Sequence, residues 1–314
     1  MKVHTGISLQ PLRNPVISIG IFDGVHKGHT AVFNRVRQRA RELKGESAIV
    51  TFWPHPRMVL GKNSDKLKFL TSQEEKVALI RRHKIDHLFV LPFTKEFSQL
   101  PACSFVRQYL VDGAGLAHLV FGFDHHFGRK REGNFENLKT CAEIYGFSIE
   151  QLEPLTEGGL RISSSAIRLA LAHGNVKLAS QLLSYHYSLH GTIIGGRQVG
   201  RAIGYPTANI RPGDMNKLIP SDGVYAVKVM MGGKSFMGMM NIGYRPTLNE
   251  EKQNRSLEVH IIDFDDNVYN RDITISFTDR IRDEKKFETL DQLKQQLAKD
   301  KAEAIRILSD TRHS

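Results

Sequence analysis

The sequence predicts two domains of different class: an α/β domain with a parallel, doubly wound sheet, followed by a small antiparallel β-barrel that ends in a helix. The first half alternates short apolar runs with longer amphipathic segments. The second half has short runs rich in Val, Ile and Tyr between glycine and acidic turns. With 314 residues the chain is also too long for one ordinary domain. We place the first domain at residues 1–184 and the second at 185–314.

In the first half, apolar runs that favour strands occupy 16–22, 47–53, 87–93 and 117–123. Amphipathic segments with helical spacing follow at 29–45, 72–84 and 103–115. Strands that alternate with helices imply crossover connections and therefore parallel pairing. Ligands of such sheets bind beyond the carboxyl ends of the strands, so the segments that follow each strand are candidates for chemistry.

From residue 188 onward the runs GVYAVKVMM, SFMGMMNIG, SLEVHIIDF and DITISFT are separated by turns, which is the spacing of a small antiparallel barrel. The tail that begins at Phe287 predicts one or two helices. Thr289 precedes an acidic, amphipathic run, and we expect it to cap the first of them.

Composition describes a globular protein, with 40% hydrophobic and 25% charged residues and no uninterrupted apolar stretch near 18 residues. We therefore expect no membrane segment, and a cytoplasmic location, since the N-terminal residues lack a signal-peptide pattern. The net charge of +11 suggests anionic partners. The basic residues are spread along the chain, which favours phosphorylated small molecules over nucleic acid as partners.

Cys103 and Cys141 share no metal-type spacing, and we expect them to be buried thiols. The oligomeric state is left open.

Residues 18–29, SIGIFDGVHKGH, place the imidazoles of His26 and His29 after an apolar strand and a glycine-rich turn. A strand, a tight turn and a helix start would bring backbone amides and a positive helix end to the ligand edge, which suits phosphate. The imidazoles can donate hydrogen bonds to phosphate oxygens, while Gly28 lets the backbone come close. An ordinary polar turn is the first alternative, and zinc binding, for which no third ligand stands nearby, is the second.

Three further segments follow this turn. In TFWPHP (51–56), His55 sits in a loop stiffened by prolines, and this segment alone is more typical of a structural loop than of a site. In FGFDHHFGRKREGN (121–134), Asp124 and several basic groups come just past another strand end. RISSSAIR (161–168) offers hydroxyls at a helix N-terminus flanked by arginines, which suits either a triphosphate or a plain helix cap.

Together and in this order, GIFDGVHKGH, TFWPHP, the FGFD..FG..R.G segment and RISSSAIR resemble the adenylyltransferase module of bacterial bifunctional riboflavin kinase/FAD synthetases, of the Rossmann-like HxGH nucleotidyltransferase group. The resemblance implies that the phosphate of FMN attacks the α-phosphorus of ATP, with Mg²⁺ on the phosphates and no covalent enzyme intermediate. It implies catalytic roles for His26, His29 and Asp124, and a place beside the flavin for His55 and Pro56. The residues that it implies for ATP are Gly20, Phe22, Asp23, Gly24, Gly28, Arg161, Ser163, Ser164 and Arg168.

In the second half, GRAIGYPTANI (200–210) follows a basic, glycine-rich loop. Thr207 and Asn209 alternate on one strand face and present two oxygens, which suits a hard cation. Glu258 heads an apolar strand, where a carboxylate is a candidate general base for a primary hydroxyl. A charge that merely solubilises an edge strand is the alternative for Glu258.

GRxxGYPTAN, GVYA, NIGxxPT, EVHI and IRDEKKF, in this order, are similar to the riboflavin kinase module of the same family. The resemblance implies ATP and Mg²⁺ at Thr207 and Asn209, with Glu258 accepting the proton of the riboflavin 5′-hydroxyl. Further residues implied for ATP are Gly200, Gly204 and Pro206, and those implied for the flavin are Arg245, Arg282 and Glu284.

The hypothesis that follows is an enzyme that phosphorylates riboflavin to FMN and then adenylylates FMN to FAD with release of pyrophosphate. One alternative is a riboflavin kinase with a weakened or inactive first domain, suggested by Trp53 and the His125–His126 pair, which depart from the family pattern. The other is a flavin-responsive RNA-binding regulator, suggested by the net charge of +11.

Overall fold

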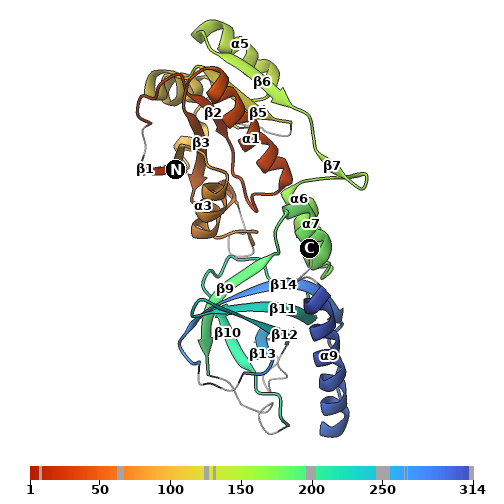
Figure 1. Cartoon of the computed structure of the whole chain (residues 1–314). Coiled ribbons are helices and arrows are strands. Elements are labelled where there is room, and N and C mark those ends of the chain that lie inside the picture. Colours follow the sequence, from red (N-terminus) through yellow and green to blue (C-terminus); the bar gives the residue numbers. More distant parts are fainter. Residues whose placement is uncertain are drawn as a thin grey trace. The chain divides into compact units, whose positions relative to one another are not determined.

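The computed structural model describes residues 1–6, 9–61, 67–123, 127–129, 132–195, 203–244, 255–264, 266 and 268–310. Contacts divide the chain into two compact units, Met1–Ser164 and Ser165–Ser314 (Figure 1). This division falls at the start of helix α6 (Ser164–Ala172), whereas the sequence boundary at residue 184 follows helix α7 (Val176–Leu183). No helix of the described ranges is long and apolar enough to cross a membrane.

The first unit is built on a six-stranded sheet in the order β1-β4-β3-β2-β5-β6, and every neighbouring pair is parallel. The strands are β1 (Lys2–Thr5), β2 (Val16–Ile19), β3 (Ser47–Trp53), β4 (His87–Pro92), β5 (His118–Gly122) and β6 (Ser148–Leu152). The four central strands and the parallel, doubly wound class are confirmed. The two edge strands were not predicted, because neither contains a fully buried residue or a continuous apolar run.

Helices cover both faces of this sheet, as parallel sheets require. They are α1 (Lys27–Glu42), α2 (Pro56–Leu60), α3 (Gln73–Arg82), the short η2 (Phe97–Gln99), α4 (Ala102–Phe105), the π-helical segment η3 (Val106–Ala114) and α5 (Phe135–Tyr145). Alternate residues of a strand enter opposite cores: Ile17 packs with η3 and α5 residues, and Val16 packs with α1 residues. The hairpin β7 (Thr156–Glu157) and β8 (Leu160–Arg161) follows β6.

The strand order reverses at β2, since β3 and β4 extend the sheet on one side and β5 and β6 extend it on the other. Such a switch point opens a crevice at the carboxyl ends of the strands, where doubly wound sheets bind ligands. The segment that begins at Gly20 starts at this crevice from β2, and the segment that begins at Phe123 starts there from β5.

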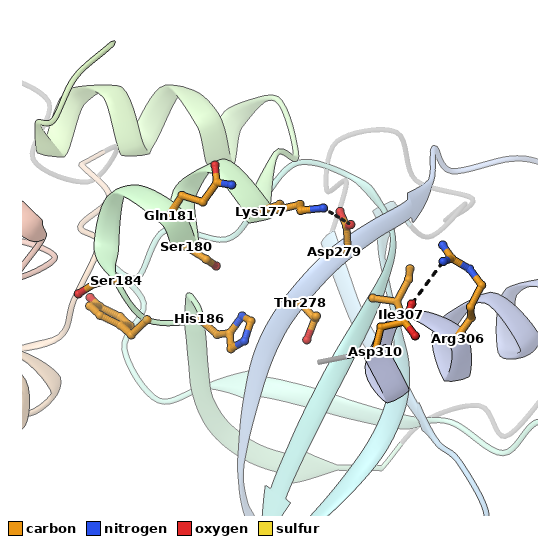
Figure 2. A pocket seen from close by; sticks show the side chains of 11 residues that line it. Lys177, Ser180, Gln181, Ser184, His186, Thr278, Asp279, Arg306, Ile307 and Asp310 are labelled. Carbon is orange, nitrogen blue, oxygen red and sulfur yellow. Dashed lines mark ion pairs between the residues drawn. The ribbon is translucent and has the colours of Figure 1, made fainter. Parts of the chain in front are cut away.

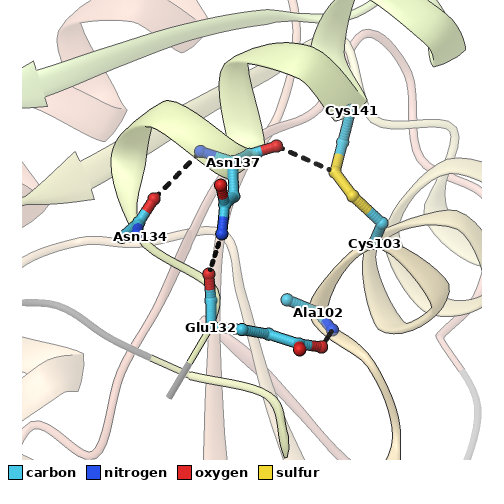
Figure 3. The surroundings of a disulfide bond; sticks show 6 residues. All are labelled: Ala102, Cys103, Glu132, Asn134, Asn137 and Cys141. Atoms are coloured by element: carbon cyan, nitrogen blue, oxygen red, sulfur yellow. Dashed lines mark hydrogen bonds between the residues drawn. A yellow bond between two sulfur atoms is a disulfide. The ribbon is translucent and has the colours of Figure 1, made fainter. Parts of the chain in front are cut away.

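Cys103 of α4 and Cys141 of α5 are joined by a disulfide, with 5.9 Å between their Cα atoms (Figure 3). This corrects the prediction of two buried thiols. The cysteines lie 38 residues apart in the chain, and only the packing of α4 against α5 brings them together. Beside the disulfide, the amide of Ala102 donates to Glu132 Oε1 at 3.1 Å, which ties the start of α4 to the segment before α5.

The second unit holds a closed antiparallel barrel in the order β10-β13-β12-β11-β14-β9, which confirms the predicted barrel. Its strands are β9 (Ser188–Ile194), β10 (Ala208–Pro212), β11 (Gly223–Met231), β12 (Lys234–Tyr244), β13 (Arg255–Ile261) and β14 (Asp272–Arg282). The tail forms one helix, α9 (Leu290–Asp310), which packs on β11, β12 and β14. Thr289 caps it as predicted, since Thr289 Oγ1 accepts from the amide of Gln292 at 3.2 Å.

A buried ion pair fastens α9 to the barrel. Asp300 is 1% exposed, and its carboxylate accepts hydrogen bonds from Arg282 Nε at 3.0 Å and Arg282 Nη2 at 2.7 Å. Gln296 Nε2 also donates to Asp300 at 2.8 Å. The side chains of β14 and α9 are therefore coupled through one carboxylate.

Asp300→Ala is expected to lower the free energy of unfolding of the second unit by about 3 kcal/mol, because it leaves the Arg282 guanidinium without its buried counter-charge. Denaturant titration monitored by circular dichroism measures this loss. The matched control is Asp310→Ala, on the same helix, where an exposed carboxylate lies 3.6 Å from Arg306. Asp310→Ala should lower the free energy of unfolding by less than about 1 kcal/mol. An equal decrease in the two variants would contradict this role of Asp300.

Candidate active sites

The turn that follows β2 has a strained backbone. Phe22 has φ 53°, Gly24 has φ 83° and Val25 has φ 39°, all in the left-handed region. That region suits glycine but is costly for an aromatic or β-branched residue, and such strain is concentrated at functional sites. Gly20 is required as well, because a Cβ at that position would lie 2.7 Å from the Phe22 ring.

Asp23 holds this turn in place. Its carboxylate is 6% exposed and accepts from the amides of Leu70 at 3.0 Å and Thr71 at 3.1 Å, and from Thr71 Oγ1 at 3.1 Å. Thr71 Oγ1 in turn accepts from the amide of Gly24 at 3.2 Å. The described contacts of Asp23 thus brace the turn against the residues that lead into α3.

The two histidines of the turn lie stacked at the start of α1. His26 is the N-cap residue, and its Nδ1 accepts from the amide of His29 at 3.4 Å. The two rings lie 3.6 Å apart between centroids, and the Phe22 ring meets His29 edge-on at 5.2 Å. A Cβ on Gly28 would approach the His26 ring to 3.1 Å, which explains the glycine. Because Nδ1 accepts, the ring hydrogen of neutral His26 resides on Nε2.

The RISSSAIR segment reaches the same turn. Ser164 Oγ donates to the backbone oxygen of Asp23 at 2.9 Å, although the residues are 141 positions apart. Ser163 precedes it, and the Arg161 guanidinium lies over the Phe123 ring at 4.9 Å. Arg168 stands one helical turn beyond Ser164 on α6, within the second contact unit.

His55 and Pro56 begin α2 beside a small cavity at the carboxyl edge of the sheet. His55 is the N-cap, and its Nδ1 accepts from the amide of Arg57 at 3.0 Å while its ring stacks on Phe69 at 4.5 Å. Pro56 is the first residue of the helix. The cavity is lined by Ile21, Asp23, Trp53, His55, Phe69, Thr71, Ser72, Gln73 and Lys76. The TFWPHP segment and the GIFDGVHKGH turn therefore border the same cavity.

Lys76, which also lines this cavity, was not predicted as a site residue. It is 5% exposed, and its Nζ donates to the backbone oxygen of Ile21 and to Thr51 Oγ1, both at 3.3 Å. Burial lowers its pKa to about 8, against an opposing effect of Asp23. Its spacing in the sequence could have indicated its burial, because a lysine four residues before the buried Ile80 lies on the apolar face of α3.

Three predicted site residues lie outside the described part of the chain. They are Asp124 of the first unit, and Gly200 and Arg245 of the second.

In the second unit, oxygen-bearing side chains meet across three neighbouring strands. Thr207, just before β10, places Oγ1 3.4 Å from Glu258 Oε2 of β13. Asn209 of β10 is opposite Glu258 in the antiparallel register, and Asn241 of β12 is opposite it on the other side. Cross-strand partners share one face of a sheet. Asn241 was missed, because the strand register that places it beside Glu258 is not visible in the sequence.

The backbone that leads into β10 is held by His260. Gly204 has φ 82°, and the oxygen of Pro206 accepts from His260 Nδ1 at 2.8 Å. Burial lowers the pKa of His260, so the neutral imidazole acts as a fixed donor here. Gly204 and Pro206 thus bring Thr207 to the start of the strand.

Of the three residues predicted for the flavin side of the barrel, the two that the structure describes have different surroundings. The guanidinium of Arg282 is bound to Asp300 of α9, and its Nη1 donates to the backbone oxygen of Asp283 at 2.8 Å. Glu284 is exposed and lies against Gly243 at the end of β12, where a Cβ would overlap its carboxylate. The described hydrogen bonds of Arg282 are therefore all made to other residues of the second unit, and its role toward the flavin stays a prediction.

Family models match both halves of the chain: residues 9–166 match FAD synthetase, and residues 183–308 match riboflavin kinase. A bifunctional riboflavin kinase/FMN adenylyltransferase from Bacillus subtilis (strain 168) is 38% identical, over 95% of this chain and 93% of its own. The enzyme with the same description from Escherichia coli (strain K12) is 36% identical over 97% of both. The chain belongs to this bifunctional family. The resemblance drawn from the motifs is confirmed, and the matches give no support to the kinase-only or RNA-binding alternatives.

A solved structure has the same succession of folds. The crystal structure described as a macrolide-efflux protein from Streptococcus pneumoniae is similar with a TM-score of 0.87 and 30% sequence identity. It covers 95% of this chain and 97% of its own chain. An α/β unit followed along the chain by a barrel is therefore also found in an experimental structure.

The second unit of this family member contains a further cavity of about 530 Å³ between α7, β14 and the end of α9 (Figure 2). Two ion pairs border it, Lys177 with Asp279 at 4.0 Å and Arg306 with Asp310 at 3.6 Å. Among its described lining residues there is none of those predicted for the kinase site. The opposite charges in each pair neutralise one another, so this cavity presents no net charge to a ligand.

Proposed function

We propose that the second unit transfers the γ-phosphoryl group of ATP to riboflavin, and that the first unit transfers the adenylyl group of ATP to the resulting FMN. Two separate groups of side chains support this proposal: the His26–His29 turn braced by Ser164, and the Thr207–Asn209–Glu258 group on the barrel. The net charge of +11 favours anionic substrates, which supports the proposal further. Action in the cytoplasm, without a membrane or nucleic-acid partner, completes the proposal.

In adenylyl transfer, a phosphate oxygen of FMN forms a bond to the α-phosphorus of ATP, and the bond from that phosphorus to the bridging oxygen of pyrophosphate breaks. Negative charge grows on the leaving pyrophosphate. His26 and His29, at the positive end of α1, would donate hydrogen bonds to the phosphate oxygens. Ser164 and Asp23 hold the turn that carries them, so the donors are oriented before the substrate arrives.

In the kinase step, Glu258 would accept the proton of the riboflavin 5′-hydroxyl as the oxygen attacks the γ-phosphorus of ATP and ADP leaves. Thr207 Oγ1 lies 3.4 Å from Glu258 Oε2, so the base is held beside the residues proposed to meet the phosphates. Asn209 and Asn241 are the cross-strand partners of Glu258 in the barrel register.

The residues at this site fit Mg²⁺, which prefers hard oxygen ligands. Thr207 and Asn209 supply a hydroxyl and an amide oxygen on the side of Glu258. Within the described ranges no group of three or more His, Cys, Asp or Glu side chains could hold a metal by itself. Bound there together with ATP, Mg²⁺ would neutralise charge on the phosphates.

Chromatography of flavins after incubation of the protein with riboflavin, ATP and Mg²⁺ tests the proposal. FMN should appear first and FAD after it, and chelation of Mg²⁺ with EDTA should stop both steps. Riboflavin that stays unphosphorylated would overturn the kinase assignment. Accumulation of FMN without FAD would instead favour a kinase whose first unit is inactive.

A further inference from the structure

Lys76 is a buried cation beneath the strained turn of the first unit. It is 5% exposed, and its Nζ has two neutral acceptors, the backbone oxygen of Ile21 and the hydroxyl of Thr51. Asp23 attracts the ammonium electrostatically, but the oxygens of that carboxylate accept hydrogen bonds from Leu70 and Thr71. The charge of Lys76 is therefore only partly compensated by the protein around it.

Packing alone does not require a lysine at this position. Burial of the ammonium is unfavourable, which is why its pKa falls to about 8. Thr51 Oγ1 itself donates to the oxygen of Ile21 at 3.2 Å, so that oxygen keeps a donor without Lys76. An uncharged side chain of similar length would fill the space without the desolvation cost. A function of the positive charge would explain why a lysine occupies this buried position.

The location of Lys76 indicates that function. Ile21 immediately precedes Phe22, the first of the left-handed residues of the turn, so the ammonium donates a hydrogen bond to the base of the turn that leads to His26. Lys76 also lines the cavity that His55 and Asp23 border at the carboxyl edge of the sheet. Phosphates bound at this edge would supply the negative charge that the buried ammonium lacks.

We propose that Lys76 is a positioning residue for adenylyl transfer, which fixes the Ile21 carbonyl at the base of the turn and holds a positive charge beneath the phosphates of the bound substrates. The inference rests on the proposed placement of the adenylyltransferase site at this turn. It assigns to α3 a part in the reaction, in addition to its part in the core.

Lys76→Met tests the role of the charge, with Arg81→Met as the matched control, since Arg81 is an exposed cation on the same helix. Lys76→Met should lower kcat/KM for FMN adenylylation about tenfold or more, without lowering the melting temperature. Riboflavin phosphorylation by the same protein should not change, and Arg81→Met should leave both activities within about twofold of the wild type. Adenylylation by Lys76→Met within about twofold of the wild type would overturn the proposal. A loss accompanied by a lower melting temperature would overturn it as well.

The pH profile of the wild-type protein gives a second readout, which needs no variant. Below a pH of about 8 the ammonium is charged, and as the pH rises through that value the charge is lost. The kcat/KM for adenylylation should therefore fall on the alkaline side, and Lys76→Met should lack this fall. Asp23 and His55, the other titratable side chains that border the cavity, are present in both proteins. A wild-type profile that stays level above this pH would contradict the role of the charge.

His26→Ala, measured in parallel, separates this inference from the placement of the site. Full adenylylation by His26→Ala would overturn the site placement and, with it, the role proposed for Lys76. An inactive His26→Ala together with a fully active Lys76→Met would overturn the Lys76 proposal alone.

Discussion

Glu258→Gln is expected to reduce riboflavin phosphorylation by about 10²–10⁴-fold, the range found for loss of a general base. Glutamine keeps the size of the side chain and an oxygen near Thr207 Oγ1, but it cannot take the proton of a hydroxyl. Adenylylation of supplied FMN should remain within about twofold of the wild type, because it takes place in the other unit. Initial rates with riboflavin and with FMN, measured on the same preparation, give both values.

Glu288→Gln is the matched control for this variant, since Glu288 is an exposed carboxylate of the same unit, just before α9. It should leave both rates unchanged. Retention of kinase activity in Glu258→Gln would show that Glu258 is a solubilising charge on the strand, the alternative that the sequence left open.

His26→Ala is expected to lower FMN adenylylation by about 10²–10³-fold, as loss of a preorganised donor to a developing anion does. The same change removes the N-cap of α1, since His26 Nδ1 accepts from the amide of His29. Loss of such a cap costs about 1 kcal/mol of stability. Adenylylation rates and thermal unfolding are therefore measured together, with riboflavin phosphorylation as the internal control.

His26→Asn separates the two roles, because asparagine is a good N-cap but has no imidazole. This variant should recover the stability lost in His26→Ala and remain poor in adenylylation. Recovery of activity with the cap would mean that His26 is an ordinary helix start, as one alternative held, and that the imidazole has no part in the reaction.

The central strands of both units could be predicted because buried strands consist of short apolar runs, such as SAIVTFW. Edge strands β1 and β6 could not, since neither has a fully buried residue and neither carries such an apolar run. The disulfide between Cys103 and Cys141 depends on the packing of α4 on α5, which no spacing along the chain expresses. The local pattern of residues thus predicts buried strands and helices, but it does not predict which segments far apart in the chain come into contact.

The candidate sites show the same division. Motifs at strand ends could be placed at the ligand edge, because parallel strands end on one side of a sheet. The hydrogen bond from Ser164 to Asp23 and the register that sets Asn241 beside Glu258 arise only from the folded chain. Lys76 was missed because its helical segment is rich in charged residues, although its spacing from Ile80 places it on the apolar face of α3.

The assignment of the two reactions requires two active sites on one chain that work independently. A mixture of His26→Ala and Glu258→Gln, supplied with riboflavin, ATP and Mg²⁺, tests this independence. Each variant alone should fail to make FAD from riboflavin, while the mixture should accumulate FAD, because FMN released by the first protein is adenylylated by the second. A mixture that forms FMN but no FAD, or no FMN at all, would contradict the assignment of the two reactions to these two sites.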